Sequence, residues 1–203
     1  MNNLKNRLIQ KLVDASGEPF VNLRTTELAP EWHHDFILHI ASIIRPKVYV
    51  ELGLRRCPLF NRMIPFADKL IGVDIDRAPE QYMIKNPKAS FVCMPTSQYA
   101  ETLKAKPIEI DLLFIDADHS EKAVFEDFNS FFPYIKPHGL IILHDGHPKS
   151  EEWLAPHLCD DSYKAIEALS KNVTEYEMMT IPFHPGLTLC RKRKNQLSWK
   201  EPK

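Results

Sequence analysis

Carboxylate and imidazole side chains gather at the points where short apolar runs of the chain end. Glu51 stands at the end of one run and Asp74 closes the next, and Asp116 and His144 follow two later runs. A carboxylate in such a position can accept two hydrogen bonds from a vicinal diol or bind a cation, and an imidazole can take up a proton near neutral pH. Either acid alone could simply cap a strand. The joint placement of Glu51 and Asp74 favours a nucleoside-type ligand.

The apolar runs that carry these residues predict buried strands, because they are short, rich in β-branched residues and bounded by turn signals. Strands that alternate with helices predict a parallel sheet, whose ligand crevice lies beyond the carboxyl ends of its strands. The sequence therefore predicts an α/β fold, a doubly wound, mostly parallel seven-stranded sheet with an antiparallel C-terminal hairpin. The predicted strands are residues 48–52, 70–74, 90–94, 110–116, 140–143, 176–181 and 187–191, and the helices between them include 78–84, 97–104, 120–132 and 162–171.

Two amphipathic helices are expected before the first strand, at residues 3–14 and 31–44. The second helix should turn its apolar residues inward. Its histidines are interpreted as surface or boundary residues, with the lining of a substrate cleft as the alternative. The residues expected to face inward are Phe36, Ile37, Ile40, Ile43 and Ile44, and the histidines are His33, His34 and His39.

Length and composition favour a single domain with one sizeable core, since 44% of the 203 residues are hydrophobic. Within this domain of residues 1–203, the N-terminal helices of residues 1–46 would form a cap or the substrate side. Residues 47–192 would form a Rossmann-like core, and residues 193–203 a solvated basic tail.

Charge and hydropathy exclude several classes of partner. A net charge of −1 argues against a general nucleic-acid surface, which needs a strongly basic face. No apolar run approaches the roughly 18 residues of a membrane span, and the charged N-terminus does not resemble a signal peptide. The four cysteines contain no CxxC pair and are expected as free thiols in a reducing compartment. We therefore expect a cytoplasmic protein that binds a small-molecule substrate, with a homodimer left open.

The motifs at five strand ends resemble those of class I S-adenosylmethionine-dependent methyltransferases, over residues Val48 to Asp145. The likeness is greatest to the small-molecule O-methyltransferases of the macrocin and caffeoyl-CoA types. It implies a Rossmann-like methyltransferase fold with S-adenosylmethionine as the cofactor. The cofactor-binding residues that it implies are Glu51 and Gly53 for the methionine part, Asp74 for the ribose hydroxyls, Thr96 and Ser97 for the adenine, and Asp116 in the fourth-strand motif.

The same resemblance implies a divalent metal. The metal-dependent relatives hold magnesium with the first aspartate of the fourth-strand motif and an Asp-Asn pair after strand five. Asp116 and Asp145 match two of these ligands, but the third position is Gly146, so His147 or His144 would have to compensate. Imidazole is softer than magnesium prefers and would shift the preference toward manganese, iron or zinc. The alternative is that Asp145 only orders its loop and that His147 lies on the surface.

A candidate catalytic base follows the fourth strand. His119 lies where the caffeoyl-CoA-type enzymes carry a basic residue next to the metal. Methyl transfer to oxygen needs the hydroxyl deprotonated, and the ordinary pKa of histidine, about 6.5, suits this role. Asp118 could orient His119 or act as the base itself. The alternative for both residues is a structural role at the start of the following helix, where a carboxylate is favoured.

The first loop departs from the family pattern, because Cys57 stands where a second glycine is usual. A side chain packed beneath the loop would be compatible with cofactor binding, whereas one in the crevice would favour a non-catalytic protein. The expected function is methyl transfer to a hydroxyl oxygen of a small polar acceptor, a sugar or another metabolite. The alternatives are a non-catalytic or regulatory protein of the same fold and, less favoured, a nicotinamide-dependent oxidoreductase, since its loop would need two more glycines.

Overall fold

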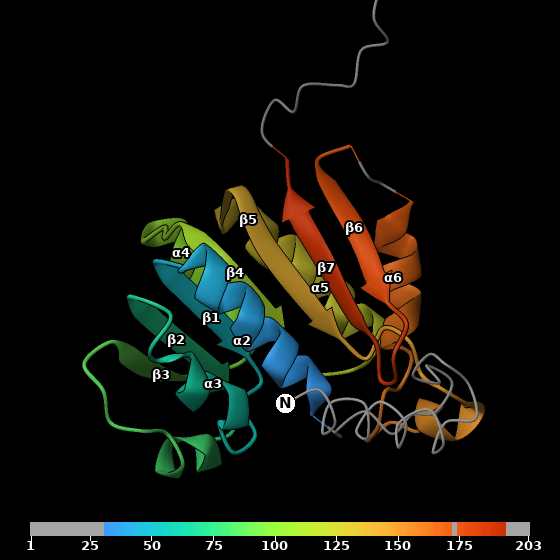
Figure 1. The fold of residues 1–203 in the computed structure, drawn as a ribbon, viewed down its shortest axis with the longest axis horizontal. Coiled ribbons are helices and arrows are strands. Elements are labelled where there is room, and N and C mark those ends of the chain that lie inside the picture. Colours follow the sequence, from blue (N-terminus) through green and yellow to red (C-terminus); the bar gives the residue numbers. More distant parts are fainter. Residues whose placement is uncertain (1–30, 172–173, 194–203) are drawn as a thin grey trace, which may run out of the picture. The chain divides into compact units, whose positions relative to one another are not determined.

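The computed structural model describes residues 31–171 and 174–193 (Figure 1). The described residues from His33 onward belong to one compact unit. The predicted helix at 3–14 and the tail from 194 lie outside the described residues. The strands are β1 Val48–Leu52, β2 Lys69–Asp74, β3 Ala89–Cys93, β4 Ile110–Ile115, β5 Ile135–His144, β6 Tyr176–Ile181 and β7 Leu187–Lys192. The helices are α2 Trp32–Ile44, α3 Pro58–Met63, α4 Thr96–Ala105, α5 Glu121–Phe131 and α6 Ser162–Ser170, with 3₁₀ turns η1 Ala78–Gln81, η2 Phe132–Tyr134 and η3 Glu151–Leu154.

The strands form a seven-stranded sheet in the order β3-β2-β1-β4-β5-β7-β6. β1 to β5 pair in parallel, and β7 runs antiparallel to both β5 and β6. In the β4–β5 register Ile115 lies beside Leu143, so the residues that follow, Asp116 and His144, leave the sheet as neighbours. The predicted fold class is confirmed, including the antiparallel C-terminal hairpin.

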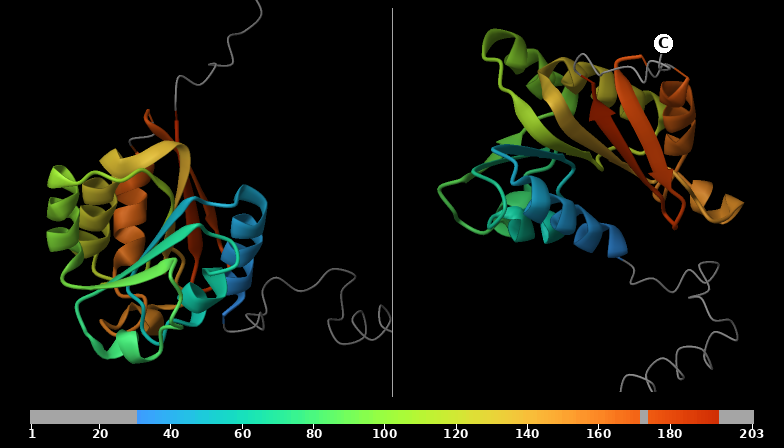
Figure 2. Two further views of the ribbon diagram at one scale, coloured as in Figure 1. Left: turned by 90° about the vertical axis from the view of Figure 1, so that its left-hand side faces the viewer. Right: turned by 45° about the horizontal axis from the view of Figure 1, so that its top comes forward.

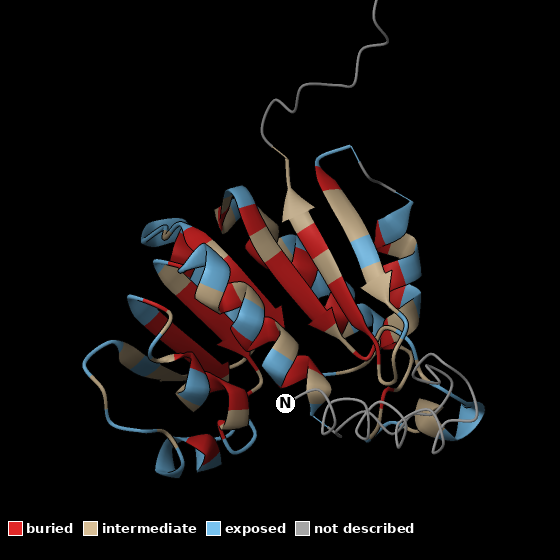
Figure 3. Ribbon diagram, viewed as in Figure 1, coloured by how far each residue is buried: buried red, intermediate tan, exposed pale blue. Residues whose placement is uncertain are grey.

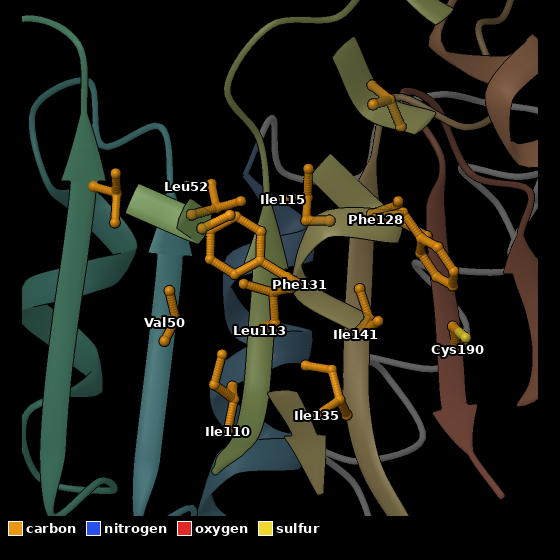
Figure 4. Packing of buried hydrophobic residues seen from close by; sticks show 14 of the residues in the cluster. Val50, Leu52, Ile110, Leu113, Ile115, Phe128, Phe131, Ile135, Ile141 and Cys190 are labelled. Carbon is orange, nitrogen blue, oxygen red and sulfur yellow. The ribbon is translucent and has the colours of Figure 1, made fainter. Parts of the chain in front are cut away.

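Helices cover both faces of the sheet. α4, α5 and α6 pack on one face, and α2 and α3 pack on the other (Figures 1 and 2). On the first face Leu113 and Ile115 of β4 share a buried cluster with Phe128 and Phe131 of α5 (Figure 4). Burying each such side chain contributes about 1.5–3 kcal/mol. The strand interiors are accordingly buried while the outer helix surfaces are exposed (Figure 3). None of the helices within residues 31–171 and 174–193 has the length and apolar character needed to cross a membrane.

The fifth strand starts earlier than predicted. Residues 135–139, which precede the predicted strand at 140–143, are part of β5, which runs from Ile135 to His144. His138 takes a positive φ of 67°, and the pairing with β4 shifts register between Ile110 and Leu112. An irregularity of this kind lets a strand continue through proline and glycine, which would otherwise end it. The carboxyl end of β5, which carries the site residues, is where the sequence predicts it.

Helix α2 lies where it is predicted, but its buried face is different. His33 and His34 are each only 6% exposed, whereas Ile43 and Ile44 are 69% and 41% exposed. The interpretation of His33 and His34 as surface residues is therefore wrong, while His39 is exposed. Imidazole is neither clearly apolar nor clearly polar, so a hydrophobic pattern misses a buried histidine. The buried residues of α2 are His33, His34, Ile37, Leu38 and Ala41.

A buried carboxyl group joins α5 to the start of α4. Asp127 is 4% exposed, and the side chain of Thr96 is hydrogen-bonded to it. Burial raises the pKa of Asp127 to about 6, and the charges of Asp118 and Glu126 act in the same direction. The folded protein therefore favours the protonated form of this carboxyl group. This stabilisation is complete below the unfolded pKa of 3.8 and is lost as the pH rises through about 6.

We expect Asp127→Asn to stabilise the protein at pH 7.5 by about 1–3 kcal/mol, because a neutral amide of similar shape removes the cost of ionising a buried carboxyl. At pH 4.5 the difference should shrink. Urea unfolding at both pH values measures it, with the exposed Glu126→Gln on the same helix as the control. A variant that is less stable than the wild type at pH 7.5 would contradict this account.

Candidate active site

Gly53 brings the first loop against the exit of β4. Its φ is +84°, a region that favours glycine, and its N–H donates to the carbonyl oxygen of Val73 at 2.9 Å. A Cβ at this position would lie 2.1 Å from the carbonyl oxygen of Asp116. Only glycine therefore fits here, and the loop is held between the ends of β2 and β4.

Asp74 ties the same loop to the end of β2. Its Oδ2 accepts a hydrogen bond from the backbone N–H of Leu54, and its Oδ1 accepts one from the N–H of Asp76, each at 2.9 Å. A carboxylate offers about four lone-pair sites. The two oxygens therefore keep capacity for two further donors on their partly exposed side.

Cys57 is packed beneath the loop. Its φ of 56° is left-handed, which explains why glycine would be at home there, and the residue is 0% exposed. Its thiol donates a hydrogen bond to the carbonyl oxygen of Pro79 at 3.4 Å. Burial, together with the charges of Glu51 and Asp74, raises the pKa of the thiol to about 11. The side chain therefore does not block the crevice, which is the arrangement compatible with cofactor binding.

The other predicted cofactor residues have different surroundings. Glu51 is 2% exposed and accepts a hydrogen bond from the Tyr49 hydroxyl at 2.5 Å, and burial raises the pKa of its carboxyl well above the usual value. Thr96 bonds to Asp127, and Ser97 is exposed beside it in the first turn of α4.

Three potential ligand atoms converge at the exits of β4 and β5. Nδ1 of His144 lies 2.9 Å from Oδ1 of Asp116 and 3.1 Å from Oδ2 of Asp145. These residues form a group that could hold a metal ion, with all three atoms within 4.8 Å of one another. Among the described residues, neither Nδ1 of His144 nor Oδ2 of Asp145 has a hydrogen bond of acceptable geometry, although both atoms are buried.

His119 lies beside this group. Its Nδ1 is 3.1 Å from Oδ2 of Asp145 and its Nε2 is 3.5 Å from Oδ1 of Asp116. Nδ1 also contacts the carbonyl oxygen of Leu158. A carbonyl can only accept, so Nδ1 carries the proton and Nε2 is the nitrogen free to accept one in the neutral ring.

The carboxylates and imidazoles of this cluster interact electrostatically. Burial alone would lower the pKa of each histidine, but the neighbouring Asp116 and Asp145 outweigh it. They raise the pKa of His144 to about 10 and that of His119 to about 9. In return, although burial acts the other way, both histidines hold the pKa of Asp116 well below its ordinary value.

Two predicted site residues lie apart from this cluster. His147 is exposed and lines a cavity of ≈ 480 Å³ together with Tyr163, Glu167 and Thr180, between α6 and β6. The geometry thus puts His144 rather than His147 beside the carboxylates. Asp118 is exposed, and its Oδ1 accepts hydrogen bonds from the N–H and hydroxyl of Ser120, as a residue that orders the start of α5 would.

Gly146 has a packing reason to lack a side chain. A Cβ there would lie 2.6 Å from Cδ1 of Ile166 and 2.8 Å from Oγ1 of Thr188. Thr188 is fully buried, so it cannot easily move aside. A third oxygen ligand at this position, as in the metal-dependent relatives, would not fit this packing.

The sequence pattern favoured a surface or boundary position for His33, with the lining of a cleft as the alternative. The ring of His33 lies 4.2 Å from that of His144, measured between centroids, and His34 is 4.3 Å from His33. Burial and the positive neighbours lower the pKa of His33 to about 3, so this ring is neutral. Two adjacent histidines in the first turn of an otherwise apolar helix were the available signal.

Residues 51–146 match a family model described as a methyltransferase domain. A search of curated proteins finds no match. The fold is similar to that of an O-methyltransferase from Bacillus cereus in complex with SAH, with 11% identity, a TM-score of 0.67 and coverage of 91% of this chain and 90% of that chain.

A second similar structure is the O-methyltransferase TomG from Streptomyces achromogenes in complex with SAM, with 11% identity, a TM-score of 0.67 and coverage of 93% and 98%. A third is the N-methyltransferase NodS from Bradyrhizobium japonicum, with 13% identity, a TM-score of 0.58 and coverage of 84% and 90%. The predicted resemblance to class I S-adenosylmethionine-dependent methyltransferases, and with it the enzyme class, is confirmed. The acceptor atom differs among proteins of this fold.

We expect Cys57→Gly to change stability by less than about 1 kcal/mol, since relief of the left-handed backbone offsets the loss of a small buried side chain. Cys57→Val should cost about 2 kcal/mol or more, because a β-branched residue at this φ is a strained outlier. Urea unfolding of the two variants measures the difference. Equal stabilities would mean that the loop does not hold this backbone conformation.

Proposed function

We propose that this methyltransferase domain transfers the methyl group of S-adenosylmethionine to a hydroxyl oxygen of a small polar acceptor, such as a sugar or another metabolite. The reaction would take place beside a divalent-cation centre formed by Asp116, His144 and Asp145. One observation carries the proposal: these ligand atoms converge, with His119 beside them, at the sheet edge that also bears Gly53 and Asp74.

The residues around β1 and β2 fit the cofactor. Asp74 has spare lone pairs for the two ribose hydroxyls, which would be a bidentate, charge-assisted contact. Ile75, the next residue, is 73% exposed and offers an apolar surface for the adenine ring. The tight backbone at Gly53 would let the methionine part lie close to the loop. Glu51 would act through the loop, because its carboxyl is buried.

The donor set fits a divalent cation. Nδ1 of His144 lies 2.9 Å and 3.1 Å from the carboxylate oxygens of Asp116 and Asp145, so one ion would be within reach of all three residues. Nδ1 of His144 and Oδ2 of Asp145 are buried and face each other as an ion pair but form no hydrogen bond, so a cation would give both atoms a better partner. A bound divalent ion would hold the acceptor oxygen and lower its pKa.

His119 is suited to take the proton. The Leu158 carbonyl keeps the hydrogen on Nδ1, so Nε2 would accept the acceptor's hydroxyl proton. Its raised pKa reflects the free charges of Asp116 and Asp145. A cation held by both carboxylates would weaken that attraction and so lower the pKa of His119.

The transfer balances with these groups alone. The acceptor oxygen forms a bond to the methyl carbon as the carbon–sulfur bond of the sulfonium breaks. The electron pair of that bond stays on sulfur and gives S-adenosylhomocysteine, and the proton ends on Nε2 of His119. The role of the protein is largely to hold the oxygen, the methyl carbon and the sulfur in line.

Oxygen is the favoured acceptor atom because a hydroxyl binds well to a hard cation and needs a base, and both groups are supported here. The alternative of a non-catalytic protein loses its two arguments. Cys57 is packed under the loop, and His144 supplies a ligand atom that Gly146 lacks. Asp118 would order the loop that carries His119 and would not itself act as the base.

We expect Asp74→Ala to weaken binding of S-adenosylhomocysteine by about 1.5–3 kcal/mol, through loss of charge-assisted hydrogen bonds to the ribose. Isothermal titration calorimetry measures it. Asp68→Ala removes the same charge from an exposed residue just before β2, at the opposite edge of the sheet, and should bind like the wild type. Unchanged affinity in Asp74→Ala would refute the ribose assignment.

We expect His119→Ala to lower kcat by about 10²-fold or more, because a positioned general base contributes that much. The readout is transfer of labelled methyl from S-adenosylmethionine to a panel of sugars and phenols. The exposed His157→Ala is the control. Prior treatment with a chelator should also abolish turnover, and a divalent ion should restore it.

Two results would change this proposal. Turnover that survives in His119→Ala would discard the base, and turnover that resists chelation would discard the cation while keeping methyl transfer. Methylation of amines alone would move the reaction to nitrogen.

A further inference from the structure

Helix α2 brings a ring to the cation centre from outside the strand ends. His33 lies in the first turn of α2 and is buried with Ile37 of the same helix. Its ring is 4.2 Å from that of His144 between centroids, tilted by 46°. α2 covers the sheet face opposite to α4, α5 and α6 (Figure 2). The site is therefore built from two parts of the fold that are far apart in the sequence.

The imidazole of His144 is held by rings from two elements. His33 of α2 contacts it, and Phe114 of β4 lies edge-on to it, with centroids 6.1 Å apart and an interplanar angle of 76°. His34 packs edge-on against His33 at 4.3 Å and supports it in turn. A ring with neighbours of this kind has little freedom to rotate about its last torsion. Its Nδ1 is thus kept facing Asp116 and Asp145.

A fixed imidazole nitrogen has consequences for the choice of ion. Magnesium prefers oxygen ligands, whereas imidazole suits first-row transition ions such as manganese, cobalt and zinc. Packing also keeps oxygen ligands of the Asn type away, because Gly146 has no room for a side chain against Ile166 and Thr188. The ligand group of the described residues is accordingly two carboxylates and one imidazole.

We propose that His33 is a positioning residue that holds the ligand ring of His144, so that the centre takes a first-row transition-metal ion in preference to magnesium. The inference rests on the proposed cation centre and names the class of ion that it binds. Partners that orient a metal-ligating histidine commonly contribute about 10- to 100-fold to metal affinity.

The test uses the full chain and Co²⁺, whose visible absorption reports its ligands directly. Titration of the apoprotein should give ligand-field bands, with Co²⁺ bound about tenfold or more tightly than Mg²⁺ in competition. His33→Ala should weaken Co²⁺ binding about 10-fold or more and broaden or shift these bands. His33→Phe keeps a ring against His144 and should stay within about threefold of the wild type.

His39→Ala is the matched control, because it removes an exposed histidine from the same helix. His144→Asp replaces the nitrogen ligand by oxygen and should move the preference toward Mg²⁺. Thermal unfolding of each apoprotein separates loss of metal binding from loss of fold, and His33→Phe keeps the test decisive if His33→Ala does not fold.

Three outcomes would overturn the inference: wild-type Co²⁺ affinity and spectrum in His33→Ala, no recovery in His33→Phe, or equal binding of Mg²⁺ and Co²⁺ by the wild type. Calorimetry with S-adenosylhomocysteine in the presence of a chelator is run in parallel. Cofactor binding without any Co²⁺ binding would overturn the metal inference and leave methyl transfer standing. Absence of both would contradict the proposed function as well.

Discussion

The pairing of β4 with β5 places two carboxyl groups close together, and the neighbouring groups must compensate their negative charge. Asp116 and Asp145 follow paired strand ends, and their ligand oxygens lie within 4.8 Å of the same imidazole nitrogen and of each other. At such a distance two full charges repel by on the order of 3–4 kcal/mol at an effective dielectric constant of about 20. Something positive must sit between them. His144 and His119 supply that charge as imidazolium ions, and a divalent cation would supply it more completely.

The first loop is subject to a different constraint, which is steric. Gly53 is in contact with the backbone at Asp116, so the loop that would meet the cofactor and the strand end that bears the carboxylate form one rigid piece. Asp74 reinforces this rigid piece by accepting a hydrogen bond from the backbone N–H of Leu54. A change in the loop would therefore move Asp116 as well. In the proposed reaction this coupling would help to hold the methyl donor and the acceptor oxygen in line, as an in-line transfer requires.

The short apolar runs and the turn residues between them were enough to predict the sheet, since a polar residue marks each strand end after an apolar run. The same marks located Asp74, Asp116, Asp145 and His119 at one edge. They could not decide between His144 and His147, because the choice depends on how the chain bends after β5. They also could not show that Gly146 is crowded by Ile166 and Thr188, since that contact joins three separate elements. The contact of His33 with His144 could not be predicted for the same reason, since the two residues are more than a hundred positions apart.

The histidines divide according to the charges around them, because burial lowers the pKa of each one. His119 and His144 face carboxylates, so their pKa values rise to about 9 and about 10 in spite of burial. His33 has the imidazoles of His34 and His144 as neighbours. Burial, together with the positive charge of these rings, lowers the pKa of His33 to about 3. A neutral ring beside a charged one adds packing without adding charge to an already crowded centre. That combination suits the positioning role proposed for His33: contact close enough to orient the ring, and no positive charge of its own to repel the cation.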